Sequence, residues 1–270
     1  MGPGIYPMSM TGRQHDFNLE RYSRQLKLPE IGETGQARLS VARVLVIGAG
    51  GLGSPVLTYL AASGIGHIGV IDSDIIALSN LNRQFLHDTA NIGQLKAESA
   101  KARLLLLNPD IDIEPQAIRV SPDNAGQLIE SYDLVVDCVD NLETRHWVNS
   151  ACIAAGKPLV EAGVSGFMGF VMTIIPGQGP CYACLHSDIE YDGAAGPPSV
   201  LGATAGIAGT IQAMEAIKVL LGIPDTLTGR ILYFDAQTME FEKIELQQNQ
   251  NCPACGFKSS NAPSGPRPAP

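Results

Sequence analysis

The chain has 270 residues, of which 45% are hydrophobic and 17% are charged, and its formal net charge is -9. A chain of this length and composition can bury a complete hydrophobic core. The acidic balance, with no basic patch in the sequence, argues against a nucleic-acid partner, because nonspecific affinity for a phosphate backbone rests on clustered Lys and Arg. The first residues lack the charged start and apolar run of a signal peptide, so we expect a cytoplasmic protein.

The two ends of the chain differ in composition from the middle. Residues 1–17 and 258–270 are rich in Gly, Pro and Ser, which is typical of disordered segments. Between them we find no internal repeat and no linker long enough to divide the chain. We therefore expect residues 18–257 to form a single domain.

Strand-like and helix-like runs alternate in the first half of the chain, after a helical piece at residues 18–39. The expected strands are 44–47, 67–72, 111–117 and 134–139, and the expected helices are 53–62, 94–107, 125–131 and 142–155. Such alternation predicts an α/β fold, with a Rossmann-like, doubly wound and mostly parallel sheet and helices on both faces. Ligands of such sheets bind at the carboxyl ends of the strands.

The pattern changes after Pro158. Two strand-like runs, PLVEAGV and FVMTIIP, precede a cysteine pair, and an apolar stretch at 199–221 precedes the runs GRILYFD and EFEKIEL. The last two runs predict a C-terminal antiparallel extension of the sheet. The apolar stretch is long enough to span a membrane, but Gln212, Glu215 and Lys218 fall on one helical face, so we expect a buried helix of a soluble protein and no membrane partner.

A glycine-rich loop follows the first strand in the segment VLVIGAGGLGSP. Gly48, Gly50 and Gly53, with Gly51 between them, fit the pattern G-x-G-x-x-G between a strand and a helix. In this pattern the glycines allow a tight turn and close approach of the backbone to a phosphate. Asp72 ends the next strand, about where a ribose-binding carboxylate belongs. These features favour nucleotide binding, and an NAD-dependent oxidoreductase is the first hypothesis.

The segment after the second strand carries cations as well as an acid. It contains Asp74, Asn80, Arg83, Gln84 and Lys96. A nicotinamide site has little use for an Arg and a Lys over the phosphates, whereas a triphosphate needs cations where charge accumulates on departing pyrophosphate. Arg83 and Lys96 could equally lie on a solvated face with ordinary charged partners.

Asp140 and Asn141 follow the strand at 134–139 in the segment DLVVDCVDNLETR. A carboxylate at this edge of the sheet could hold a magnesium ion that faces the phosphates. Either residue could instead cap the next helix. The spacing alone leaves both roles open.

Four of the six cysteines form two C-x-x-C pairs, Cys181 with Cys184 and Cys252 with Cys255. Two such pairs supply the four thiolates of a closed structural zinc site. One pair could instead be redox-active, but that would leave the other unexplained. Cys138 and Cys152 fall in a predicted strand and a predicted helix, where a thiol is usually a small buried hydrophobic group.

These segments form a collinear set of motifs. In chain order the motifs are RYSRQ, GAGGLGSP, DSDIIALSNLNRQFLH, IGQLKAESA, NP, DCVDN, CYACL, GTIQAMEAIKVLLG and CPACG, from about Leu19 to Gly256. The set resembles the ubiquitin-activating-enzyme-like adenylyltransferases of the MoeB/ThiF/HesA family. The resemblance implies a homodimer that uses ATP and Mg²⁺ to adenylate the C-terminal glycine of a small ubiquitin-like sulfur-carrier protein, with release of pyrophosphate.

The resemblance also implies roles for individual residues. Arg24 matches the arginine that reaches the phosphates of the partner protomer, Asp72 matches the ribose ligand and Asp140 matches the Mg²⁺ ligand. The four paired cysteines match the structural Zn²⁺ ligands. The residues expected around ATP are Gly48, Gly50, Gly51, Gly53, Asp72, Asp74, Asn80, Arg83, Gln84, Lys96, Asp140 and Asn141, and those expected to act in catalysis are Arg24, Arg83, Lys96 and Asp140.

The sequence departs from some relatives in one respect. The segment HSDIEYDGAAGPPSVLGA, after the first cysteine pair, contains no cysteine. We therefore expect adenylation without a covalent enzyme–carrier intermediate, and a separate protein as sulfur donor. The carrier remains open among those of molybdopterin, thiazole, thiolated tRNA and cysteine synthesis. Activation of a carboxylate on modified tRNA and a non-catalytic scaffold are further alternatives.

Overall fold

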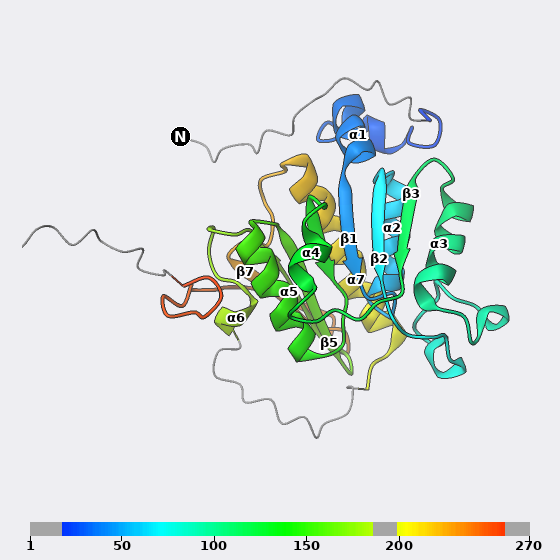
Figure 1. Ribbon diagram of the computed structural model, residues 1–270. Helices are drawn as coiled ribbons and strands as arrows, with labels where there is room; N and C mark the ends of the chain where they lie inside the picture. Colours follow the sequence, from blue (N-terminus) through cyan, green and yellow to red (C-terminus); the bar gives the residue numbers. More distant parts are fainter. Residues whose placement is uncertain (1–17, 186–198, 257–270) are drawn as a thin grey trace, which may run out of the picture.

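An eight-stranded sheet forms the centre of the computed structural model, which describes residues 18–185 and 199–256 (Figure 1). The strand order is β3-β2-β1-β4-β5-β6-β7-β8. β1 to β5 run parallel, and β5 to β8 pair antiparallel. The strands are β1 (Arg43–Ile47), β2 (His67–Ile71), β3 (Asp112–Gln116), β4 (Leu134–Asp137), β5 (Leu159–Ser165), β6 (Met168–Ile174), β7 (Arg230–Asp235) and β8 (Glu240–Glu245). The predicted α/β sheet with a C-terminal antiparallel extension is confirmed.

Helices cover both faces of the sheet and bury two apolar cores. One face carries α2 (Gly53–Ser63), α3 (Lys96–Leu107) and α7 (Gly202–Leu221), and the other carries α4 (Ala125–Ile129), α5 (Leu142–Ala155) and α6 (Tyr182–Leu185). Because side chains alternate along a strand, Val44 and Val46 of β1 enter the first core while Leu45 and Ile47 enter the second. The central strands β1, β2 and β4 are buried on both faces and therefore read as mostly apolar runs.

The N-terminal piece lies at the amino ends of the parallel strands. It contains η1 (Gln25–Lys27) and α1 (Gly32–Val41). The amide of Gln25 donates a hydrogen bond of 2.9 Å to the carbonyl of Ser63, just before β2 begins. Figure 1 shows α1 at the top of the sheet, opposite the loops at the carboxyl ends of the strands. Two further short helices, η2 (Leu78–Asn80) and η3 (Thr89–Asn91), belong to those loops.

Gln212 and Glu215 of α7 point into the protein. Gln212 donates to the backbone carbonyls of Asp137 at 2.7 Å and Val160 at 3.3 Å, and it bridges β4 and β5. Glu215 accepts hydrogen bonds from Thr173 and from the backbone N–H of Leu227. Among the described residues, none of the helices has the length and hydropathy to cross a membrane.

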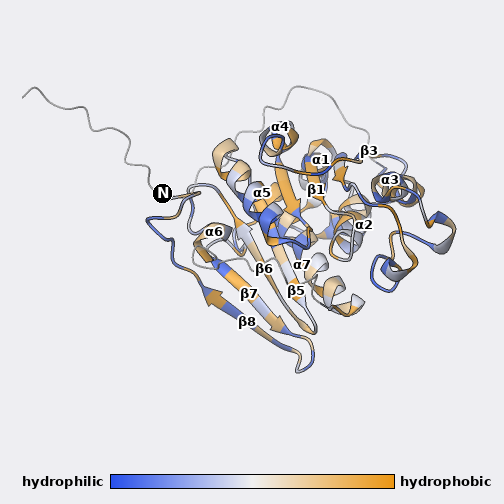
Figure 2. Ribbon diagram, turned by 60° about the horizontal axis from the view of Figure 1, so that its bottom comes forward, coloured by the Kyte–Doolittle hydropathy of each residue, from blue (hydrophilic) through white to orange (hydrophobic). Residues whose placement is uncertain are grey.

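The structure refines several predicted boundaries. α3 begins at Lys96 rather than 94, and α4 ends at Ile129 rather than 131. α6, a single turn at the first cysteine pair, was not expected. Figure 2 shows β8 at the edge of the antiparallel extension. The expectations for residues 1–17, 258–270 and most of the cysteine-free segment after Cys184 fall outside the described residues.

Candidate nucleotide site and cysteine cluster

The candidate site lies where the parallel strands end. The glycine loop follows β1, the segment from 72 to 95 follows β2, and Asp140 follows β4, which is the neighbour of β1. Parallel strands bring these three connections to the same edge of the sheet, which is where doubly wound folds bind their ligands.

Two glycines of the loop are required by the backbone itself. Gly48 has φ of 101°, in the left-handed region, and a Cβ there would lie 2.7 Å from the carbonyl oxygen of Cys138. A Cβ on Gly53 would lie 2.0 Å from the carbonyl oxygen of Gly48. Gly50 and Gly51 are different, since a Cβ at either position would meet only ordinary contacts, 3.4 Å or longer. The fold therefore needs glycine at 48 and 53 but has room for a Cβ at 50 and 51.

Asp72 ties the glycine loop to the end of β2. One of its carboxylate oxygens accepts a hydrogen bond of 2.8 Å from the backbone N–H of Ala49, and the other accepts one of 2.9 Å from the N–H of Asp74. Each oxygen retains a second lone pair. Asp72 can thus hold the loop and still accept a ribose hydroxyl.

Lys96 does not lie on a solvated face. Its side chain is 7% exposed, and its ammonium group lies 2.8 Å from a carboxylate oxygen of Asp74. The N–H of Lys96 also donates to the carbonyl of Asp74 at 2.9 Å, so the start of α3 is fixed to the loop after β2. Arg83 is partly buried and donates to the carbonyl of Ser79 and the amide oxygen of Asn82.

Gln84 leaves a buried acceptor beside the glycine loop. Its Nε2 atom lies 3.5 Å from where a Cβ on Gly50 would be. Its Oε1 atom is buried and has no hydrogen-bond partner among the described residues. Asn80 shapes the same loop, since its side chain accepts from the N–H of Ala77 at 3.0 Å and its carbonyl accepts from Arg83 and Gln84. A hydroxyl- or amine-bearing ligand could donate a hydrogen bond to such a buried acceptor.

Asp140 and Asn141 take different positions. The side chain of Asn141 caps α5 by accepting a hydrogen bond of 2.9 Å from the N–H of Thr144. Asp140 is exposed, and no hydrogen bond or ion pair joins its carboxylate to another described residue. A single carboxylate is therefore free at this end of β4.

His87 supports the loop and was not predicted from the sequence. Its Nε2–H donates to the carbonyl of Ala49 at 2.9 Å, which leaves Nδ1 to accept from the hydroxyl of Ser99 at 3.0 Å. Burial lowers the pKa of His87, although the hydrogen bond to Ala49 acts in the opposite direction. The neutral ring therefore links α3 to the glycine loop. A lone histidine in a loop carries no pattern that could have revealed this role.

Arg24 lies far from the other predicted residues of its own chain. It is exposed and immediately precedes η1, whose Gln25 contacts Ser63 at the amino end of β2. The nucleotide residues lie at the carboxyl end of that strand. A strand of five residues is about 16 Å long, which exceeds the reach of an arginine side chain.

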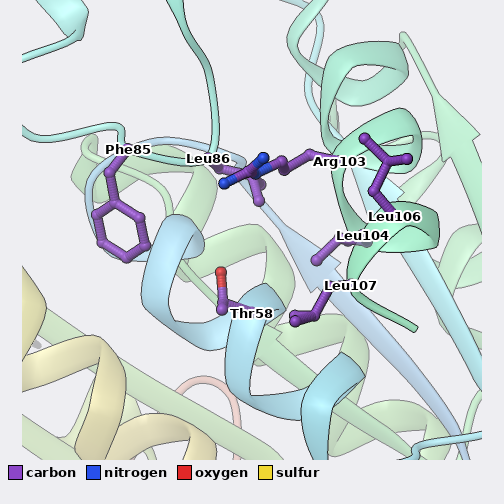
Figure 3. Close-up of a pocket in the computed structure, with 7 residues that line it drawn as sticks. All are labelled: Thr58, Phe85, Leu86, Arg103, Leu104, Leu106 and Leu107. Atoms are coloured by element: carbon purple, nitrogen blue, oxygen red, sulfur yellow. The ribbon is translucent and has the colours of Figure 1, made fainter.

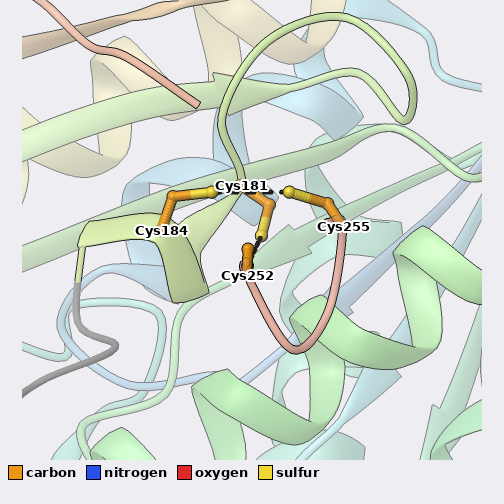
Figure 4. Close-up of side chains that lie close together, drawn as sticks. All are labelled: Cys181, Cys184, Cys252 and Cys255. Atoms are coloured by element: carbon orange, nitrogen blue, oxygen red, sulfur yellow. Dashed lines mark hydrogen bonds between the residues drawn. The ribbon is translucent and has the colours of Figure 1, made fainter. Parts of the chain in front are cut away.

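The four paired cysteines meet in space (Figure 4). Their sulfur atoms all lie within 4.8 Å of one another. Cys181 is 3.6 Å from Cys252 and Cys184 is 3.4 Å from Cys255, measured between sulfurs. Sulfurs around a tetrahedral zinc ion are about 3.8 Å apart, so the cluster has the dimensions and the donor set of a four-thiolate site.

Polar groups surround the cysteine cluster. Asn149 donates to the sulfur of Cys181 at 3.5 Å, and Gln248 donates to that of Cys255 at 3.5 Å. Burial raises the pKa of Cys184 to about 11. For Cys252, burial raises the pKa, but hydrogen bonds with the backbone of Cys255 and Ala254 and with the side chains of Cys184 and Cys181 together lower it to about 7. A bound cation would therefore be needed to stabilise the remaining thiols of the cluster as thiolates.

A separate cavity of about 380 Å³ lies between α2, α3 and the loop at Phe85 (Figure 3). None of the residues predicted to bind the nucleotide lines it. Its walls are Thr58, Phe85, Leu86, Arg103, Leu104, Leu106 and Leu107. The cavity opens on a surface where Phe85 is 56% exposed and Leu106 is 81% exposed.

Known proteins are similar to this chain along most of its length. The model of the ThiF family matches residues 22–254. The chain is 43% identical over 241 residues to the SAMP-activating enzyme E1 of Haloferax volcanii, across 88% of this chain and 89% of that protein. It is 43% identical over 246 residues to the sulfur carrier protein adenylyltransferase of Thermus thermophilus, across 88% and 91%. The crystal structure of E. coli MccB with ATP is similar with a TM-score of 0.78 and 25% identity, across 88% of this chain and 75% of that chain.

Proposed function

The chain belongs to the ThiF family and is an adenylyltransferase, and we propose that it activates the C-terminal glycine of a small ubiquitin-like sulfur-carrier protein. The observation that carries this proposal is the meeting of the glycine loop, Asp72, the Lys96–Asp74 pair and a free Asp140 at one edge of the sheet. The two similar adenylating proteins named above are matched along nearly their full length. No observation favours the oxidoreductase or the tRNA-directed alternative.

The reaction needs positioning and charge stabilisation rather than a general base. A carboxylate oxygen of the carrier attacks the α-phosphorus of ATP, a new oxygen–phosphorus bond forms, and the bond to the β-phosphate breaks to release pyrophosphate. The carboxylate is already ionised at neutral pH. Lys96 and Arg83 would stabilise the negative charge that moves onto the leaving pyrophosphate.

A magnesium ion fits the free carboxylate of Asp140. Mg²⁺ prefers oxygen ligands and is usually held by one or two carboxylates plus phosphate oxygens. When bound, it would neutralise charge on the phosphates. Asp140 would hold the ion, and Asn141 would fix the start of α5 beside it through its helix cap.

A zinc ion fits the four-cysteine cluster and would be structural. All four ligand positions are filled by Cys181, Cys184, Cys252 and Cys255, which leaves none open for chemistry. The ion would tie the C-terminal segment to α6, and Asn149 and Gln248 would orient two of the ligands.

A second copy of the chain would complete the site. A two-fold axis across the strands would bring Arg24 of one protomer to the carboxyl edge of its partner, and such an interface uses the same surface on both copies. The exposed apolar residues at the cavity of Figure 3 offer such a surface, since Phe85 is 56% and Leu106 81% exposed. Tyr59, which follows the cavity residue Thr58 in α2, is 51% exposed. We propose a homodimer on this basis.

The remaining cysteines take no covalent part in this proposal. Cys138 and Cys152 are buried, and burial raises the pKa of both thiols. Sulfur would then come from a separate donor protein after adenylation. The paired thiols remain reduced in the cytoplasm, where we place the enzyme.

Exchange of labelled pyrophosphate into ATP tests the proposal. The exchange should depend on one of a panel of small proteins that end in Gly-Gly. Asp140→Ala should slow exchange by about a hundredfold or more, because the lost ligand acts mainly as charge moves onto pyrophosphate. Asp123→Ala, which removes another exposed carboxylate, should leave exchange unchanged. Normal exchange by a folded Asp140→Ala protein would remove Asp140 from the mechanism.

A further inference from the structure

Two buried carboxyl groups lie side by side beneath the loop that carries Asp140. Asp137 and Glu161 are register partners on the parallel strands β4 and β5, so their side chains leave the same face of neighbouring backbones about 4.8 Å apart. Both residues are 0% exposed. Two like charges at such positions repel each other, and in a dry interior they cannot both remain ionised without compensation.

One cation faces this pair. Arg145 of α5 is 6% exposed, forms an ion pair with Glu161 and also donates to the carbonyl of Ala162. The surrounding titratable groups are Cys138 on β4, Cys152 on α5, Tyr182 on α6 and Lys157 beyond α5. Cys138, Cys152 and Tyr182 are neutral because burial raises the pKa of each. Among the described residues, Arg145 is therefore the single buried cation that faces the two carboxyl groups.

The hydrogen bonds leave two oxygens unmatched. Glu161 accepts from Arg145 through Oε1, and Asp137 accepts from the N–H of Val139 through Oδ1 at 3.0 Å. The other oxygen of each carboxyl, Oε2 of Glu161 and Oδ2 of Asp137, is buried without a partner among the described residues. One proton between these two oxygens would satisfy both and would leave one negative charge opposite one guanidinium. Burial raises the pKa of both carboxyl groups, which agrees with a retained proton.

The same group of residues holds the backbone just before Asp140. The peptide N–H of Val139 donates to Asp137, and the carbonyl of Val139 accepts from Arg145 at 2.7 Å. Val139 is thus fixed at both its polar groups. The carboxylate of the next residue, Asp140, has no partner within the described part of the chain, so its position depends on that of Val139.

We propose that Asp137 and Glu161 share one proton and form, with Arg145, a neutral buried clamp on Val139 that positions Asp140. The shared proton stands on the geometry alone, whereas the positioning of Asp140 for magnesium rests on the proposed function. The three clamp residues touch neither substrate nor metal in this proposal and are positioning residues.

A double-mutant cycle tests the shared proton. Asp137→Asn or Glu161→Gln replaces one carboxyl by a neutral group of similar shape, and each leaves a carboxylate for Arg145, so the folding equilibrium constant measured in urea should change less than about tenfold. The double variant leaves the buried guanidinium of Arg145 without a counter-ion. Its folding equilibrium constant should therefore fall at least about a hundredfold below the value expected if the two single effects were additive. Additive effects would overturn the shared proton.

Infrared spectroscopy provides a second readout if the double variant does not fold. The wild type at neutral pH should show one carbonyl band of a protonated carboxylic acid that shifts in D₂O. The band should be absent from each single variant, because the remaining carboxyl is ionised. A wild-type protein without this band, or a band that persists in both single variants, would overturn the proposal.

The magnesium dependence of pyrophosphate exchange tests the positioning role. Arg145→Lys keeps the charge but cannot donate to Glu161, Ala162 and Val139 together, so half-maximal exchange should require several times more Mg²⁺. Arg230→Lys alters an arginine that pairs with an exposed aspartate near β7 and should leave this requirement unchanged. An unchanged Mg²⁺ requirement in folded Arg145→Lys would overturn the positioning role. If the wild type shows no exchange with any carrier, the proposed function and the positioning role fail together, and the urea cycle still decides the shared proton.

Discussion

We expect two glycines of the loop to have different roles, one in packing and the other in ATP binding. Gly53 serves packing, because a Cβ would lie 2.0 Å from the carbonyl oxygen of Gly48. Gly50 leaves space for a Cβ, which would meet the amide of Gln84 at an ordinary contact distance of 3.5 Å. Gly53→Ala should therefore destabilise the protein by about 1–3 kcal/mol, as overpacking does. Gly50→Ala should change stability by less than about 0.5 kcal/mol and weaken ATP binding about tenfold by filling that space.

Urea denaturation and titration calorimetry with ATP separate these two effects. The informative contrast is between the two variants, since each serves as the control for the other. If Gly50→Ala lost as much stability as Gly53→Ala and still bound ATP normally, the loop would be a packing feature and nothing more.

The sequence indicated which residue types could bind a ligand, but it could not show which of two adjacent residues takes that role. Asp140 and Asn141 are adjacent, and both residue types cap helices and bind ligands. The choice depends on backbone angles at the end of β4, where the side chain of Asn141 points back to Thr144. For Lys96, the charge pattern also fitted a solvated face, and burial became visible only once α3 was packed against the loop that carries Asp74.

At the scale of helices and strands, periodicity was the informative signal. The runs between 44 and 155 predicted the parallel strands and their helices to within a few residues, because buried strands and amphipathic helices differ in their apolar spacing. Contacts between helices and strands that are distant in the sequence left no comparable pattern in it. Asp137, Arg145 and Glu161 come together only because β4 and β5 pair in register across α5, and no local pattern encodes that register.

The cysteine cluster also depends on the contact between two segments that are distant in the sequence. It joins α6 to a C-terminal loop that is 71 residues away in sequence. Cys184→Ser should lower the zinc content from about one per chain and reduce the melting temperature, before it alters nucleotide binding, because a closed four-thiolate site is structural. Cys152→Ala, which removes a buried thiol outside the cluster, should retain the metal. Metal analysis with calorimetry measures both, and a well-folded, metal-free wild type with two disulfides would contradict the assignment.

For the whole molecule, the position of the N-terminal piece was the feature that the sequence could not supply. A helical piece was predicted at residues 18–39, where the structure forms η1 and most of α1. The edge of the sheet on which this piece packs could not be predicted, since hydrogen bonds such as that from Gln25 to Ser63 join segments far apart in the chain. The structure places Arg24 and the residues predicted to bind the nucleotide at opposite edges of one chain. A site that uses all of them must draw on two chains.

Mixed dimers test this arrangement. Arg24→Ala and Lys96→Ala should each abolish most pyrophosphate exchange when tested alone, because every active site then lacks one cation. When the two variants are combined, a heterodimer contains one site with both variant positions and one site with both wild-type residues, so exchange should recover to about half of the wild-type rate per heterodimer. Purification with two different tags verifies the heterodimer. Because Arg24 and Lys96 would restore each other only across the interface, a verified heterodimer without recovered exchange would show that Arg24 does not act on its partner's site.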